Sequence, residues 1–213
     1  RAFSNGTIEL NGAVTKDTLR PDDTRGYLFI EGEFGLKGDF TLDFDIQTVS
    51  DDAYFNVYDY GPSERLESAL TLTRARRDDF LQADLTYYET LLASEENDTQ
   101  PSVMVNTMYE RRFYPDRIGG EFRLGAIMHA HYRQSDLDYD SDDADSIVDG
   151  RDMARLSAEA SWRRRWTLAG GIRAGITGYL WADRFEVRQD ATSENSASQL
   201  TPAASVELRY AYE

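Results

Sequence analysis

Strict alternation of apolar and polar residues is the feature that most restricts how this chain can fold. Residues 40–47 read Phe-Thr-Leu-Asp-Phe-Asp-Ile-Gln, so every second side chain is apolar. Successive side chains of a β-strand point to opposite faces, so a period of two predicts a strand with one apolar and one polar face. Residues 37–39 (Lys-Gly-Asp) have turn chemistry and predict a tight hairpin with the strand before them.

The same period recurs along the chain and predicts about ten antiparallel strands. The longest apolar face runs over residues 122–132, where it alternates with a set that includes Arg123, His129 and His131. We therefore predict an all-β fold. The expected strands, in chain order, cover about 7–15, 27–36, 40–47, 66–72, 81–87, 103–109, 122–133, 154–162, 166–182 and 204–210.

The connections between these strands alternate between long and short. Outer-membrane barrels have short periplasmic turns and longer outer loops, so every second connection should be long. We therefore predict an antiparallel up-and-down transmembrane β-barrel segment, with residues 1–213 forming a single outer-membrane region. A soluble sheet with one wet face would show the same residue pattern, but it has no reason to alternate its loop lengths. The long connections are expected at 16–25, 50–64, 93–102, 134–152 and 188–198, and the short ones at 37–39, 77–79, 114–119 and 163–165.

Composition agrees with a barrel and excludes other classes. The mean hydropathy of −0.60 and the lack of a run of 18 apolar residues exclude a helical span, whereas barrel strands need only about ten residues with a polar lumen side. A net charge of −16 argues against a nucleic-acid partner. Aromatic residues lie near the expected strand ends, as in the girdles of membrane barrels. They are Phe40, Tyr87, Tyr109, Tyr132, Trp162, Trp166 and Tyr210.

No motif in the sequence predicts catalysis, a cofactor or a metal. Cysteine is absent, and there is no phosphate-binding glycine loop, nucleophile elbow or zinc motif. Strand parity instead predicts a set of side chains that face a polar lumen, although a register error of one residue would invert a whole strand. The lumen-facing candidates are Asp43, Asp45, Asp84, Tyr88, Arg123, His129, His131, Arg155, Glu159, Arg173, Glu207 and Arg209.

The two histidines leave one enzymatic alternative open. His129 and His131 lie two residues apart and therefore on the same face of a strand, close to the expected outer loops. This placement weakly resembles that of the omptin-type barrel proteases, but a metal site would need a third ligand. We favour lumen-facing polar residues. A complete ten-strand barrel, acting as a pore or protease, and a soluble β-sheet binding module remain the competing hypotheses.

Charge is concentrated in three further segments. Residues 134–152 contain eight aspartates, but from Asp138 the sixth position is Asp143 and the twelfth Asp149, where a calcium loop needs Gly and Glu. We expect a solvated acidic outer loop, with weak Mg²⁺ or Ca²⁺ association as the alternative. Residues 74–77 and 163–165 are rich in arginine and are expected at short turns on the periplasmic rim.

Several segments resemble one family of outer-membrane proteins. Residues 40–55, which end in Val-Ser-Asp-Asp-Ala-Tyr-Phe, and the following residues 56–61 are similar to a recurring strand and loop of the lipopolysaccharide-assembly barrels of the LptD (OstA) family. Residues 109–113, 119–122 and 150–157 also resemble this family, in particular its alphaproteobacterial members. The similarity covers nearly the whole chain, and the segment 49–55 is its most specific part.

The resemblance implies a translocon in the outer membrane of Gram-negative bacteria that inserts lipopolysaccharide into the outer leaflet. Its expected partners are lipopolysaccharide, membrane lipid, an LptE-type lipoprotein enclosed by the barrel, and the periplasmic Lpt bridge. Family barrels have more strands than we count here, together with a periplasmic jellyroll domain and, in many members, disulfides. Because the chain also starts abruptly at Arg1, as a mature protein or an excised segment would, we expect an interior section of a larger barrel.

Overall fold

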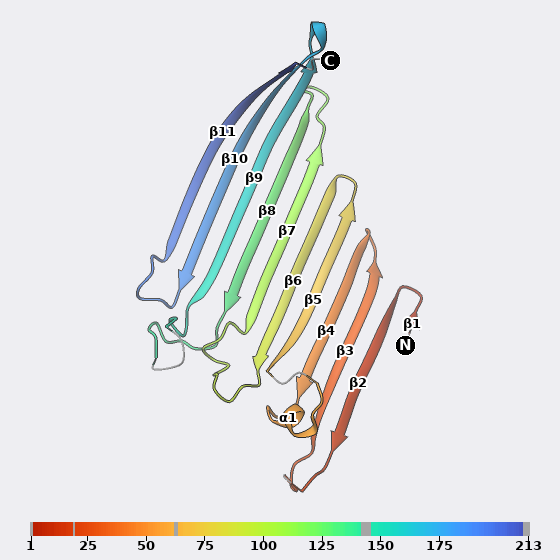
Figure 1. The fold of residues 1–213 in the computed structure, drawn as a ribbon, viewed down its shortest axis with the longest axis vertical. Coiled ribbons are helices and arrows are strands. Elements are labelled where there is room, and N and C mark those ends of the chain that lie inside the picture. Colours follow the sequence, from red (N-terminus) through yellow and green to blue (C-terminus); the bar gives the residue numbers. More distant parts are fainter. Residues whose placement is uncertain (1, 19, 62–63, 142–145, 211–213) are drawn as a thin grey trace.

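The computed structural model describes residues 2–18, 20–61, 64–141 and 146–210, which form a single antiparallel sheet with one short α-helix (Figure 1). The helix is α1 (Tyr54–Tyr58), and one 3₁₀ turn, η1, covers Ala169–Gly171. The strands are β1 (Ala2–Phe3), β2 (Gly6–Thr15), β3 (Arg25–Leu36), β4 (Phe40–Val49), β5 (Arg65–Arg76), β6 (Asp79–Thr90), β7 (Val103–Phe113), β8 (Glu121–Tyr132), β9 (Asp152–Thr167), β10 (Ile172–Arg188) and β11 (Ser196–Tyr210).

The strands follow one another in the sheet in the order of the chain. Each pairs antiparallel with the next, from β1 to β11. The predicted all-β, up-and-down arrangement is therefore confirmed, and the ten predicted strands correspond to β2–β11. Within the described residues the order is linear, so the sheet has one edge at β1 and β2 and another at β11 (Figure 1).

The alternation of connection lengths is also confirmed. The long connections lie together at one end of the sheet and the short ones at the other (Figure 1). The long connections cover residues 16–24, 50–64, 91–102, 133–151 and 189–195, and the short ones residues 4–5, 37–39, 77–78, 114–120 and 168–171.

One predicted turn is wrong. Residues 163–165 lie inside β9, where Arg163 is opposite Thr177 and Arg165 is opposite Gly175 of β10. The turn falls instead at residues 168–171, where Gly170 and Gly171 adopt positive φ angles of 75° and 78°. Three consecutive arginines can continue a strand here because two of them lie on its polar face, and glycine is the residue that takes up positive φ without steric cost.

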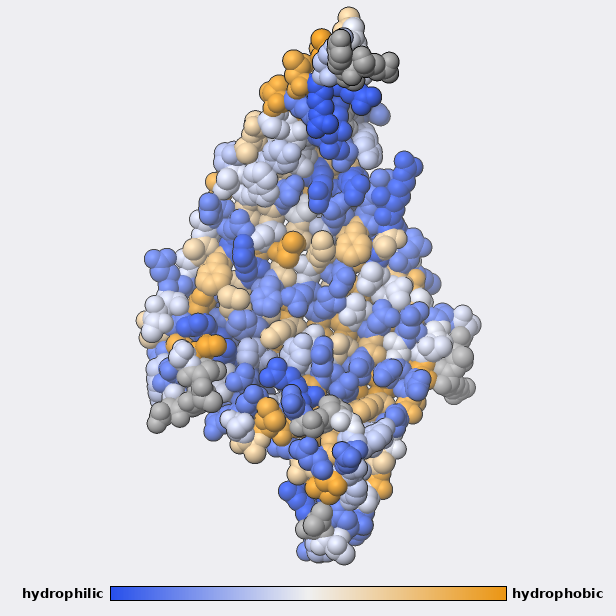
Figure 2. All heavy atoms as spheres, viewed as in Figure 1, coloured by the Kyte–Doolittle hydropathy of each residue, from blue (hydrophilic) through white to orange (hydrophobic). Residues whose placement is uncertain are grey.

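The two faces of the sheet differ in chemistry. On one face, Phe34, Leu42 and Leu72 lie side by side on neighbouring strands, and the charged residues of this face, such as Arg164 and Arg188, lie toward the strand ends. The other face carries most of the charged residues. Figure 2 shows that hydrophilic residues cover much of the middle of the molecule as viewed, with hydrophobic residues scattered between them.

The apolar face is open to its surroundings. Leu10, Leu180 and Val206 are 62%, 41% and 82% exposed. A water-soluble domain of this length would bury such a face against a second layer. The buried hydrophobic residues among those described lie instead near the end with the long connections, and they are Tyr54, Phe55, Leu66, Leu91, Val148 and Val187.

Helix α1 folds back over the polar face. The pairing of β4 with β5 ends at Asp45 and Ala69. Beyond that point, Tyr54 and Phe55 of α1 pack against Tyr27 and Phe29 of β3, with ring centroids 5.5 Å apart for Tyr27 and Phe55. Helix α1 therefore covers one end of the polar face. None of the described helices is long and apolar enough to cross a membrane.

Candidate functional site

The polar face of the sheet brings together all twelve residues that strand parity singled out. Cross-strand pairing links them in rows, because residues opposite each other on neighbouring strands point to the same side. One such row contains Glu33, Asp43, Thr71, Asp84, Asn106, His129 and Arg155. Other rows place Tyr88 opposite Glu67, Glu159 opposite Gly125 and Arg173 opposite Arg209.

The polar face of β2–β6 is acidic, and we call this region the acidic wall. Glu9, Glu31 and Asp45 lie next to one another in one row, and Glu33 lies opposite Asp43 in the next. Like charges opposite each other reduce the stability of a sheet. The carboxylates of the acidic wall are Glu9, Glu31, Glu33, Asp43, Asp45, Glu67 and Asp84, and most of them line a hollow of about 1140 Å³.

Uncharged side chains donate hydrogen bonds to some carboxylates of the acidic wall. The Nε2 amide of Gln47 donates to Asp45 at 3.0 Å, and the hydroxyl of Thr71 donates to Asp84 at 2.9 Å. The arginines that β3 and β5 contribute to this face, Arg25 and Arg65, lie at the end with the long connections. The middle of the wall therefore carries uncompensated negative charge.

The polar face of β7–β11 is rich in arginine, and we call it the basic wall. Most of its carboxylates contact arginine: Glu110 accepts hydrogen bonds from Arg112 and Arg123, with N–O distances of 2.8 and 2.7 Å, and Arg163 contacts Glu121 at 2.9 Å. Arginines outnumber acidic residues in this wall. The arginines are Arg112, Arg123, Arg155, Arg163, Arg165, Arg173 and Arg209, and the acids are Glu110, Glu121, Glu159, Asp183 and Glu207.

The two histidines lie on the basic wall near the end with the long connections. Nδ1 of His129 is 2.7 Å from Oδ1 of Asn106, and the rings of His129 and His131 are 5.7 Å apart. In the described part of the chain, no three His, Cys, Asp or Glu side chains converge as a metal site would require. The two histidines therefore lie among the other polar side chains of the basic wall.

The acidic connection 133–151 is attached to its neighbour. Asp142, Asp143 and Asp145 lie outside the described residues. Elsewhere in the connection, Gln189 donates to Asp136 at 2.8 Å, and Arg151 contacts Asp190 at 2.6 Å. Hydrogen bonds from Thr192, together with the contact to Arg151, hold the pKa of Asp190 well below its usual range. The connections 133–151 and 189–195 are therefore joined by polar contacts, of which the one between Arg151 and Asp190 is partly buried.

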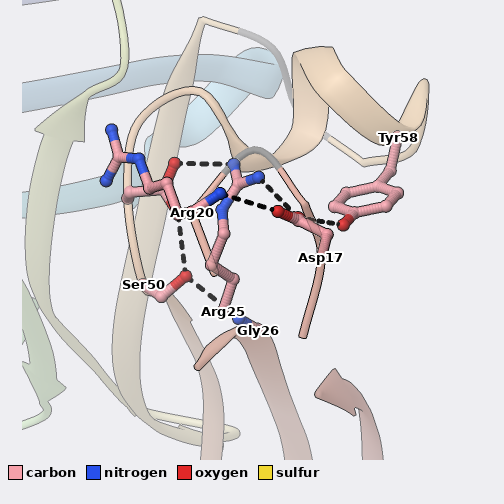
Figure 3. Close-up of polar contacts among 7 residues, drawn as sticks. Asp17, Arg20, Arg25, Gly26, Ser50 and Tyr58 are labelled. Atoms are coloured by element: carbon pink, nitrogen blue, oxygen red, sulfur yellow. Dashed lines mark hydrogen bonds and ion pairs between the residues drawn. The ribbon is translucent and has the colours of Figure 1, made fainter. Parts of the chain in front are cut away.

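A second polar network, centred on the buried side chain of Arg25, fixes α1 over the acidic wall (Figure 3). Arg25, which is 3% exposed, forms two 2.8 Å hydrogen bonds to Asp51 and one of 3.0 Å to Asp17. The hydroxyl of Tyr58 in α1 also donates to Asp17. Hydrogen bonds from Arg25 lower the pKa of Asp51, and the neighbouring Asp17 carboxylate raises the pKa of Tyr58.

Sequence reasoning missed this network and part of both walls. Arg25 and Asp51 are 26 residues apart, so periodicity gives no sign that they meet. The sequence could have identified Glu9, Glu31 and Glu33, because each alternates with apolar residues of its own strand, as Asp43 does. The sequence predicts a turn at residues 163–165, so it does not place Arg163 and Arg165 in a wall.

Comparison with known protein families identifies a match over most of the chain. A family model described as LptD, LPS transport system D, matches residues 23–213. The match spans β3–β11 and so includes most of the acidic wall, the whole basic wall and α1. A comparison with curated proteins found no match.

Proposed function

Because the chain belongs to the LptD family of lipopolysaccharide-transport proteins, we propose that its sheet is a section of an outer-membrane β-barrel that helps to insert lipopolysaccharide into the outer leaflet. The single observation that carries this proposal is the open apolar face. In lipid, a barrel wall satisfies all backbone hydrogen bonds between strands and presents only apolar side chains outward. A sheet whose leucines and valines are exposed on one face suits that environment.

The polar face is proposed to line the lumen. The twelve predicted residues would then face the interior, where both walls meet water, a partner protein or the sugar and phosphate groups of the cargo. This function requires guidance rather than bond chemistry, since the LptD family transports and assembles lipopolysaccharide and is not an enzyme family. The walls act through their shape and charge.

The arrangement of connections supports an orientation. In outer-membrane barrels the short turns face the periplasm and the long loops face outward. We therefore place residues 37–39, 77–78, 114–120 and 168–171 on the periplasmic side. The acidic connection 133–151 and helix α1 then lie at the outer surface, with α1 folded inward over the lumen side of β3 and β4.

The edges of the sheet support a larger assembly. Among the residues that the structure describes, β11 has a neighbouring strand on only one side, and an unpaired edge inside lipid would leave backbone groups without partners. Further strands are proposed to close the barrel, of which residues 1–213 would form one region. An LptE-type lipoprotein inside the barrel and the periplasmic Lpt bridge are proposed as partners on the basis of the family.

Depletion of the parent protein tests the proposal. Lipopolysaccharide at the surface of intact cells, measured by antibody binding, should fall as the protein is depleted and return when the wild-type gene is restored. Total cellular lipopolysaccharide, measured in parallel, separates a transport defect from a synthesis defect. Unchanged surface lipopolysaccharide in depleted cells would contradict the proposed function.

A further inference from the structure

Three arginines meet on the polar face at the short-turn end of the basic wall. Arg165 comes from β9, Arg173 from β10 and Arg209 from β11, and together with Glu207 they line a hollow of about 110 Å³. We call this group the arginine cradle. It lies at the end of the sheet that the proposed orientation places in the periplasm.

The arginine cradle holds more positive than negative charge. Arg173 and Arg209 lie directly opposite each other on neighbouring strands, an arrangement that repulsion makes unfavourable. Glu207 is the acidic residue lining the hollow, and both Arg165, at 4.0 Å, and Arg209 contact it. The hollow is therefore lined by three guanidinium groups and one carboxylate, and an anion would neutralise the excess positive charge.

Gly175 leaves space at the floor of the cradle. It lies between Arg165 and Glu207 in one row of the sheet. A Cβ atom at this position would meet Cγ of Arg165 at 3.4 Å and Cβ of Glu207 at 3.7 Å, so a larger side chain would enter the hollow. The φ angle of Gly175 is not positive. Backbone strain therefore does not explain glycine here, and the missing side chain leaves the hollow open to a ligand.

Guanidinium groups match one class of ligand particularly well. The planar fork of arginine donates two parallel hydrogen bonds to phosphate oxygens, and several arginines around a small hollow favour a compact dianion. Glu207 disfavours an anion, so it should limit the affinity of the cradle rather than contribute to it. The acidic wall on the other half of the face repels the same ligand and would keep it near β9–β11.

We propose that Arg165, Arg173 and Arg209, above the floor formed by Gly175, bind a phosphate monoester of the transported glycolipid at the periplasmic end of the wall. This inference rests on the proposed function and adds a recognition site to it. The shared chemistry is that of a phosphate dianion, which free phosphate also offers, so the experiment must separate the two sources.

The test compares variants of the full-length parent protein in lipid nanodiscs. The probes are lipopolysaccharide, the same lipopolysaccharide after chemical removal of its phosphate groups, and inorganic phosphate as a competitor. The double variant Arg173→Gln with Arg209→Gln should bind phosphorylated lipopolysaccharide about tenfold more weakly, because two charge-assisted contacts are lost at an exposed site. It should bind the dephosphorylated form as the wild type does.

Two further variants separate recognition from folding. Glu207→Gln should tighten binding of the phosphorylated form, whereas a residue with only a structural role would not improve binding when it is replaced. Gly175→Val should weaken binding by filling the hollow. The matched control is Arg184→Gln with Arg188→Gln, which removes two arginines of β10 from the opposite face and the opposite end, and should leave binding unchanged. Heat-dependent gel mobility checks that each variant is folded.

Each outcome decides the proposal. Competition by inorganic phosphate at millimolar concentration would support the cradle with free phosphate as a source, and loss confined to phosphorylated lipopolysaccharide would support the glycolipid. Equal affinities of the double variant and the wild type, or equal losses for both lipid forms, would overturn the cradle. If depletion of the protein still removes surface lipopolysaccharide, only the cradle fails and the proposed function stands.

Discussion

The acidic wall and the basic wall belong to one continuous sheet, yet their polar faces carry opposite charge. Both alternate with period two, and both carry apolar residues on the opposite face. The acidic wall has neighbouring carboxylates with few cations, whereas most carboxylates of the basic wall contact arginine. In the barrel proposed above, a single solvent, lipid, would act on the whole apolar face, whereas the polar face would meet different groups along its width.

The two walls are also covered differently at the end with the long connections. Over the acidic wall, Arg25 holds Asp17 and Asp51 and so fixes α1 against the sheet. Beside the basic wall, Arg151 and Asp190 join two connections to each other. The contacts of Arg25 hold a connection over the polar face, whereas the contact between Arg151 and Asp190 joins two neighbouring connections.

The largest expected effect tests the division between the two faces. Leu70→Arg puts a charge in the middle of the apolar face, where the side chain is 42% exposed, and should destabilise the protein by about 2–4 kcal/mol in lipid. Thr71→Arg, one residue along β5, places the same charge on the acidic wall and should cost little. Urea unfolding in lipid vesicles measures both. Similar losses for the two variants would mean that the face assignment is wrong.

The next prediction concerns the cover over the acidic wall. Arg25→Met leaves Asp17 and Asp51 without their shared partner, so α1 should detach and the connection 50–64 should become rapidly cleavable by protease. Arg65→Met is the matched control, because Arg65 is 48% exposed and contacts Glu95 at 3.5 Å. It should change cleavage little. Resistance of the Arg25 variant would show that the network does not hold the helix.

Acid should weaken both the Arg25–Asp51 contact and the Arg151–Asp190 contact, with a smaller effect than the Arg25 substitution. The pKa values of Asp51 and Asp190 are lowered in the folded state. Their contributions are therefore complete above the unfolded value of about 3.9 and are lost as the pH falls through the folded pKa. Hydrogen exchange, corrected for intrinsic rates, should show increasing exposure of the connections between about pH 4 and about pH 2.

A variant identifies the groups responsible for this pH dependence. In Asp51→Asn the connection 50–64 should exchange faster already at neutral pH and change little on acidification. The connection 189–195 should keep its wild-type profile, because Asp190 is unaltered. Identical profiles for wild type and variant in residues 50–61 would remove Asp51 from the explanation.

The smallest expected effect is a change in stability whose sign should differ between the two walls. Glu31→Gln removes a charge that lies between Glu9 and Asp45, and should stabilise the protein by about 0.2–1 kcal/mol. Glu110→Gln removes the partner of Arg112 and Arg123, and should destabilise it by about 0.2–1 kcal/mol. Unfolding in vesicles at low salt measures both, and shifts of the same sign would show that the walls do not differ in their electrostatics.

Much of the fold could be predicted from local pattern. The side-chain period of a strand is two, so the faces of β4 and β8 follow from the sequence alone, and the lengths of the connections follow from the gaps between periodic segments. The end of β9 could not be predicted in this way. The run of arginines at residues 163–165 predicts a turn, but the turn forms at Gly170 and Gly171, because glycine adopts positive φ angles without steric cost.

The sequence by itself determined which residues share a face, because alternation along one strand depends only on local backbone geometry. It also determined the family, through segments such as residues 49–55. The tertiary structure decided which strands lie side by side, and therefore that carboxylates gather on one wall and arginines on the other. It also decided that Arg25 meets Asp51, and that three arginines surround Gly175. These contacts join residues distant in the chain, and register between strands fixes them rather than any local preference.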